Sequence, residues 1–157
     1  MRCFRQFCLQ RKQEEKAMIQ IISGEKGKGK TKFLLERVNE AIKNAKGNIV
    51  FLDKNTKHMY ELHNKVRLIN VPELPVDSPE EFTGFLCGIL SQDNDLEEVY
   101  LDSFLTIAHI EDMDQFCKIL NKLNVLSDKY NIKFTLSVSK DKEDLPECAK
   151  QYIDISL

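Results

Sequence analysis

The sequence predicts an α/β protein with three layers, in which helices cover both faces of a mostly parallel central sheet. From Met18 onward, short apolar runs alternate with longer stretches of helical periodicity, the pattern of repeated strand-helix-strand units. Most of the short runs are almost continuously apolar, as expected of strands that are buried on both faces. The length of 157 residues and the hydrophobic content of 42% suit one domain with a single sizeable core.

Six strands are predicted, each from a short run rich in β-branched and other apolar residues. They lie at residues 18–23, 48–53, 66–71, 97–102, 132–138 and 152–155. Ligands of open parallel sheets bind outside the carboxyl ends of the strands. We therefore expect the functional residues to lie at that edge of the sheet.

Four helices are predicted between the strands, at residues 30–45, 56–64, 79–91 and 111–130. The first and the last show apolar residues at three- and four-residue spacing, which indicates one buried face. Ser78 is the expected cap of the third helix, and Asn131 is the expected stop of the fourth. Residues 70–77, which contain two prolines, are predicted to form an extended loop.

The first 17 residues are predicted to be a disordered or non-native extension, and residues 18–157 to be the folded domain. The extension shows no useful periodicity and ends directly before the first strand, so that Met18 is a candidate for the true start. Two alternatives stay open. One is a disordered basic tail, and the other is an organellar transit peptide, for which the arginines are suitable but Glu14 and Glu15 are not.

Charge, cysteine content and hydropathy limit the binding partners and the cellular compartment that we expect. The net charge is −2, and the chain from Met18 onward is acidic, which gives nucleic-acid binding no electrostatic support. No apolar run approaches the roughly 18 residues that cross a membrane. We expect a cytoplasmic protein whose cysteines are free thiols, because they are odd in number and scattered: Cys3, Cys8, Cys87, Cys117 and Cys148.

Residues 24–31, with the sequence GEKGKGKT, match the phosphate-binding pattern G-x-x-x-x-G-K-[ST]. An apolar strand precedes the match and an amphipathic helix follows it, which is the context that the chemistry needs. Glycines let the backbone N–H groups curl around a phosphate, and the helix directs its positive end at the same anion. The predicted binding residues are Gly24, Glu25, Lys26, Gly27, Lys28, Gly29, Lys30, Thr31 and Lys32.

Lys30 is expected to reach the β- and γ-phosphates of ATP, and the Thr31 hydroxyl to bind Mg²⁺. A second metal partner should follow a neighbouring apolar strand, and Asp102 ends the run Val-Tyr-Leu-Asp. Asp102 is therefore predicted to hold Mg²⁺ together with Thr31. Aspartate is also common after strands, so this prediction depends on its pairing with the loop at residues 24–31.

With these motifs, residues 18–157 resemble the P-loop NTPases, and among them the RecA-like group. The likeness rests on residues 24–31, on Leu101-Asp102-Ser103, and on residues 135–139 (TLSVS), which look like a sensor strand with a polar end. The resemblance implies the three-layer P-loop NTPase fold. It also implies a sheet order, by first residue, of 66, 48, 97, 132, 18 and 152.

The chain also resembles small stand-alone bacterial P-loop proteins that carry loose labels such as twitching-motility ATPase. The motor function that this label names is not expected, because a pilus-retraction motor needs further domains and His/Asp boxes that are not visible in this sequence.

The residues that would make such a site an efficient hydrolase are hard to find in the sequence. Asp53 is the best candidate for the catalytic base, although a loop or capping role is as reasonable. Arg37 and Arg67 are the two arginines after Met18, and Arg67 opens a strand at the end far from the nucleotide. Lys140 and Lys142 are weaker candidates for the missing charge, since a solvated loop explains them better. The three histidines lie in polar stretches and are expected at the surface.

The function predicted is that of an ATP- and Mg²⁺-binding protein with weak or partner-dependent ATPase activity. It would act as a nucleotide switch, or as a component of a larger complex with a protein partner or with copies of itself. Two alternatives remain: a small-molecule kinase, which the missing arginines disfavour, and a nucleotide-binding interaction module that does not hydrolyse.

Overall fold

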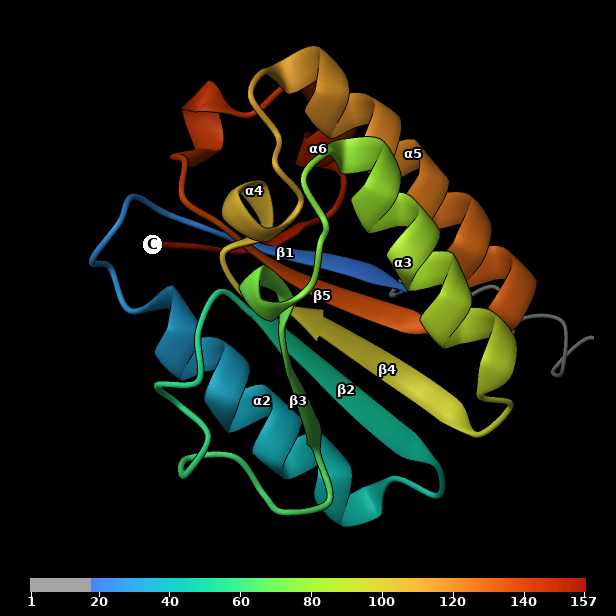
Figure 1. Cartoon of the computed structure of the whole chain (residues 1–157). Helices are drawn as coiled ribbons and strands as arrows, with labels where there is room; N and C mark the ends of the chain where they lie inside the picture. Colours follow the sequence, from blue (N-terminus) through green and yellow to red (C-terminus); the bar gives the residue numbers. More distant parts are fainter. Residues whose placement is uncertain (1–17) are drawn as a thin grey trace, which may run out of the picture.

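The structure is a computed structural model and describes residues 18–157. Its centre is a six-stranded sheet in the order β3-β2-β4-β5-β1-β6, and every neighbouring pair is parallel (Figure 1). This is the order expected from the sequence, which predicted a mostly parallel sheet. The strands are β1 (Ile19–Ser23), β2 (Asn48–Asp53), β3 (Arg67–Asn70), β4 (Leu96–Leu101), β5 (Lys133–Val138) and β6 (Ile153–Ser156).

Helices lie on both faces of the sheet and complete the three layers. Figure 1 shows α2 against one face and α3 and α5 against the other. The α-helices of the described chain are α2 (Lys30–Asn44), α3 (Pro79–Gln92), α4 (Phe104–Ile107), α5 (Met113–Tyr130) and α6 (Glu147–Lys150). Two 3-10 turns, η1 (Val71–Glu73) and η2 (Lys142–Asp144), complete the described elements.

Alternation along the strands divides the core between the two faces. In β2, Ile49 and Phe51 pack in the cluster under α2, whereas Val50 and Leu52 belong to the larger cluster under α3 and α5. All four side chains are buried. A strand of this kind reads as a continuous apolar run because neither of its faces meets water.

Side-chain caps set the ends of the long helices on the second face. Ser78 Oγ accepts the Glu81 N–H at 3.1 Å at the start of α3, as the sequence predicted. Asp112 Oδ1 accepts the Gln115 N–H at 2.9 Å at the start of α5. Asn131 ends α5 in the left-handed conformation, with a φ of 54°, and so confirms the predicted stop.

The predicted helix at residues 56–64 is wrong, because this segment forms turns. Asn55 Oδ1 accepts the Lys57 N–H at 3.0 Å, a local bond that competes with helix formation. Met59 and Tyr60 are 48% and 91% exposed, and Leu62 is the large apolar side chain of the segment that packs against the core. A short helix needs a buried apolar face for stability, and one partly buried side chain does not provide it.

The prediction that the cysteines are free thiols is also wrong for one pair. Cys117 of α5 and Cys148 of α6 form a disulfide, which closes a separation of 31 residues. Cys87 of α3 forms no disulfide with another cysteine of residues 18–157. Cys3 and Cys8, like the whole extension at residues 1–17, lie outside the described residues. Free thiols were one reason to expect a cytoplasmic protein, and that reason does not hold for Cys117 and Cys148.

Within residues 18–157 no helix combines the length and the apolar character that membrane crossing requires.

Candidate functional site

The loop between β1 and α2 is shaped by two glycines in the left-handed region. Gly27 has a φ of 91° and Gly29 a φ of 87°, values that other L-residues adopt at a cost. The base of the loop is fixed by the Gly24 N–H, which donates to the Lys140 carbonyl at 2.9 Å. The loop therefore crosses from sheet to helix with residues 25–29 exposed.

Lys30 is the first residue of α2, and its side chain is folded back toward the loop. Its Nζ donates to the Glu25 carbonyl at 2.9 Å, and the residue is 7% exposed. Burial lowers the pKa of Lys30, the positive charge of Lys54 lowers it further, and the nearby Asp102 carboxylate acts in the opposite direction. The arrangement holds a cation beside the loop with little water around it.

Thr31 and Asp102 meet, although 71 residues separate them in the sequence. The Thr31 hydroxyl donates to Asp102 Oδ2 at 2.9 Å, and the Ser137 hydroxyl donates to Asp102 Oδ1 at 2.5 Å. The Ser103 N–H donates to the same Oδ1 at 3.0 Å and to Ser137 Oγ at 2.8 Å. Asp102 is 3% exposed, so these bonds hold its carboxylate in one orientation at the carboxyl edge of the sheet.

A cavity of about 350 Å³ opens over this edge of the sheet. Among the predicted binding and metal residues, those that line it are Lys26, Gly27, Gly29, Lys30, Thr31 and Asp102. The other four predicted residues of the loop region do not line the cavity. Gly24 is buried beneath the loop, Glu25 contributes the carbonyl that holds Lys30, and Lys28 and Lys32 are exposed.

Asp53, the candidate base, ends β2 next to the cavity but does not line it. The residue is 2% exposed, and its Oδ1 accepts the Lys54 N–H at 2.7 Å. Its Oδ2 has no hydrogen-bond partner within the described part of the chain. Burial raises the pKa of Asp53, and the neighbouring Asp102 charge raises it further.

Five residues beyond the predicted set also line the cavity. Ser137 and Ser139 come from the strand segment that the sequence likened to a sensor strand, and Ser103 directly follows Asp102. Lys54 and His58 come from the segment after β2. His58 was expected at the surface, and the structure places it, partly exposed, in the wall of this cavity.

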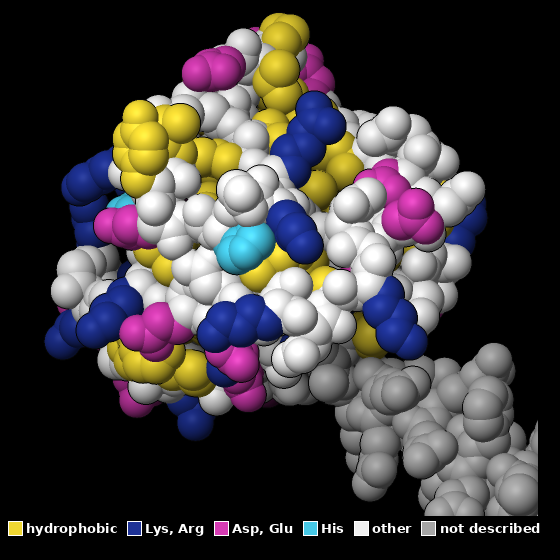
Figure 2. Space-filling model, turned by 90° about the horizontal axis from the view of Figure 1, so that it is seen from below, with side chains coloured by type: hydrophobic (Ala, Val, Ile, Leu, Met, Phe, Trp, Pro, Cys, Tyr) yellow, Lys and Arg dark blue, Asp and Glu magenta, His cyan; other side chains and the backbone are white. Residues whose placement is uncertain are grey.

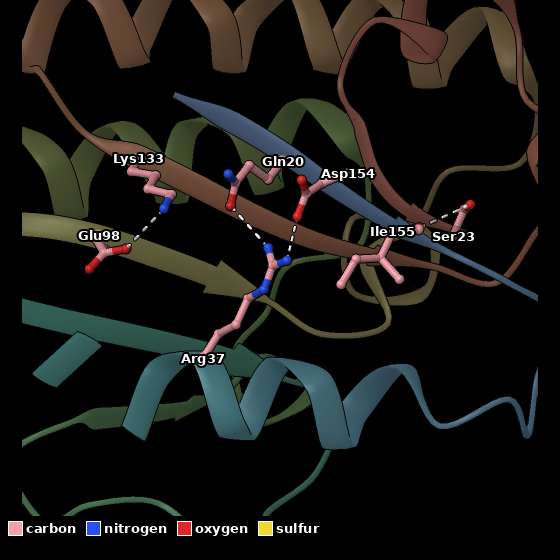
Figure 3. Close-up of polar contacts among 7 residues, drawn as sticks. All are labelled: Gln20, Ser23, Arg37, Glu98, Lys133, Asp154 and Ile155. Carbon is pink, nitrogen blue, oxygen red and sulfur yellow. Dashed lines mark hydrogen bonds and ion pairs between the residues drawn. The ribbon is translucent and has the colours of Figure 1, made fainter. Parts of the chain in front are cut away.

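Neither of the two arginines within residues 18–157, Arg37 and Arg67, lines the cavity. Arg37 donates to Gln20 Oε1 at 3.0 Å and pairs with Asp154, beneath the sheet and two turns along α2 from Lys30 (Figure 3). Figure 3 also shows Lys133 directed at Glu98 in the same region. Arg67 is exposed at the start of β3, the opposite end from the carboxyl edge. Lys140 and Lys142 do not line the cavity either.

Charges of both signs are distributed over the surface around α2. Figure 2, which looks at the molecule from below, shows Lys and Arg side chains interspersed with Asp and Glu side chains. A face of mixed charge provides no extended positive field for a nucleic-acid backbone. The charge distribution on this face therefore gives no support for nucleic-acid binding.

Comparison with protein-family models finds no match, and comparison with curated proteins finds no significant match.

Proposed function

We propose that the chain is a RecA-like P-loop protein that binds a nucleoside triphosphate, ATP with Mg²⁺, in the cavity over the carboxyl edge. The observation that carries the proposal is the meeting of Lys30, Thr31 and Asp102 in that cavity from two distant segments of the chain. Each of the three side chains matches the role that its type serves in phosphate and metal binding.

The local chemistry suits a polyphosphate. Gly27 and Gly29 line the cavity, and a Cβ atom at either position would meet no atom within 4 Å, which leaves room for a ligand against the backbone. The amino end of α2 adds the positive end of its dipole. Lys30 would exchange its bond to the Glu25 carbonyl for bonds to phosphate oxygens, which are charged and therefore stronger acceptors.

The site also suits Mg²⁺, which proteins usually hold through one or two carboxylates, water and substrate phosphates. Thr31 and Asp102 would hold the ion, and Ser137 and the Ser103 N–H would keep Asp102 oriented toward it. When bound, the ion would offset the negative charge of the phosphates.

Hydrolysis is proposed to be weak or dependent on a partner. Asp53 is buried beside the cavity without lining it, and neither Arg37 nor Arg67 is directed toward it. A partner, or a second copy of the chain, would then supply what the cavity lacks, in keeping with a switch or a component of a larger complex. The position of Asp53 also leaves open a binding module that does not hydrolyse.

Nucleotide-dependent thermal unfolding tests the proposal. ATP with Mg²⁺ should raise the midpoint of wild-type unfolding, and Lys30→Ala should abolish the shift. Lys43→Ala is the matched control, since Lys43 lies in the last turn of the same helix, is exposed and does not line the cavity. The proposal fails if ATP with Mg²⁺ gives no shift, or if both variants respond like the wild type.

Two further assays separate the alternatives. Phosphate release distinguishes a weak ATPase from a module that only binds. Transfer of labelled phosphate to small-molecule acceptors would instead identify a kinase.

A further inference from the structure

The segment at residues 54–66, called the β2–β3 loop below, is the part of the cavity wall that the predicted motifs do not explain. Figure 1 shows it leaving the carboxyl end of β2 and running alongside α2 before β3 begins. Asn39 of α2 ties it down, because its Nδ2 donates to the Glu61 carbonyl at 2.7 Å and its Oδ1 accepts the His63 N–H at 2.9 Å. The loop is thus held in place without being a helix or a strand.

Two cationic or basic side chains of this loop, Lys54 and His58, line the same cavity as Lys30. Lys54 follows β2, whose Leu52 carbonyl accepts the Asp102 N–H at 2.9 Å, and so it lies beside the proposed metal residue. His58 Nδ1 lies 2.9 Å from Glu61 Oε2, a contact that orients the ring and leaves Nε2 for another partner. The two residues therefore form a basic wall next to Asp102.

The order of the strands shows which end of a bound triphosphate this wall would face. The glycine-containing loop follows β1, Asp102 follows β4 two strands away, and Lys54 follows β2 one strand further on. A phosphate chain that starts on the loop and extends toward Thr31 and Asp102 has the β2–β3 loop ahead of its terminal phosphate. No arginine of residues 18–157 lines the cavity, so Lys54 and His58 are the basic side chains on this side of it.

We propose that Lys54 and His58 bind the terminal phosphate and make the site prefer a nucleoside triphosphate over a diphosphate. This inference rests on the proposed nucleotide-binding function. Loss of either side chain removes a charged hydrogen bond to the γ-phosphate and none to the α- or β-phosphate. The affinity for triphosphate should therefore fall on the order of tenfold for each variant, whereas the affinity for diphosphate should stay unchanged.

The test is calorimetric titration of the full chain with a non-hydrolysable ATP analogue and with ADP, both with Mg²⁺. Lys54→Ala and His58→Gln are the test variants, and thermal unfolding without nucleotide checks that each is folded. Lys57→Ala and His63→Gln are matched controls, because both residues belong to the β2–β3 loop, are exposed and do not line the cavity.

The expected result is a selective loss of triphosphate affinity in the two test variants, with both controls like the wild type. Equal losses for both nucleotides, or no loss for either, would overturn the role of Lys54 and His58 while leaving nucleotide binding intact. If the wild type binds neither nucleotide, the proposed function itself is wrong, and this inference fails with it.

Discussion

Removal of the Ser137 hydroxyl should destabilise the protein even without a nucleotide, because this group holds the buried Asp102 carboxylate. Ser137 is 1% exposed, donates to Asp102 Oδ1 at 2.5 Å and accepts the Ser103 N–H at 2.8 Å. In Ser137→Ala the Ser103 N–H keeps its bond to Asp102 at 3.0 Å, so the main loss is one hydrogen bond to a charged, buried acceptor. Such a loss costs about 2 kcal/mol.

Urea unfolding followed by circular dichroism measures this change, and a loss of about 2 kcal/mol corresponds to a melting point lower by about 4 to 8 °C. Ser139→Ala is the control, since Ser139 is exposed just beyond the same strand and should change stability by less than about 0.5 kcal/mol. If Ser137→Ala were as stable as Ser139→Ala, the bonded arrangement around Asp102 would be refuted.

Three other changes have defined outcomes. Burial raises the pKa of Asp53 in the folded protein above the ordinary value of 3.8. Protonation of Asp53 therefore stabilises the folded state fully at a pH below 3.8, and this stabilisation is lost as the pH rises through the raised pKa. Asp53→Asn should therefore stabilise the protein at pH 7 to 8, with a gain that vanishes in acid. Reduction of the Cys117–Cys148 disulfide, which spans 31 residues, should lower the free energy of unfolding by about 3 to 4 kcal/mol. Gly29→Ala should cost about 1 to 2 kcal/mol because the φ of residue 29 is 87°, whereas Gly84→Ala within α3 should stabilise by about 0.5 to 1 kcal/mol.

Each of these has an outcome that would contradict it. For Asp53→Asn, that outcome is a stability difference from the wild type that does not vary between pH 4 and pH 8. For the disulfide, Cys148→Ser should lose its sensitivity to dithiothreitol, and an oxidised wild type that is no more stable than this variant would show that the bond contributes nothing. For the glycines, equal effects at Gly29 and Gly84 would show that the left-handed backbone of the loop carries no cost.

The fold was predictable because parallel strands that are buried on both faces appear in the sequence as short, continuous apolar runs. The run at residues 49–52 is apolar at every position, and the structure buries all four side chains on two opposite faces. The order of the strands did not follow from periodicity, since any of several orders would bury the same residues. It was predicted through the resemblance of residues 24–31, 101–103 and 135–139 to a known family.

The part of the cavity wall formed by the β2–β3 loop was not predictable, and the reason is physical. The path of residues 54–66 depends on hydrogen bonds between the Asn39 side chain of α2 and the loop backbone, which no local pattern encodes. His58 therefore looked like an ordinary polar surface residue. The pairing of Cys117 with Cys148 was hidden for a similar reason, because it depends on how α5 and α6 meet in space.

The most direct test of the central claim is the dissociation constant of ATP with Mg²⁺, measured by calorimetry for the wild type and for Lys30→Ala. The wild type should bind with one site per chain, and removal of the Lys30 charge should weaken binding by about tenfold to a hundredfold, as expected for the loss of charged hydrogen bonds to phosphate. Chelation of Mg²⁺ should weaken wild-type binding as well. A wild type that binds no ATP, or a Lys30→Ala variant that binds it equally well, would contradict the account.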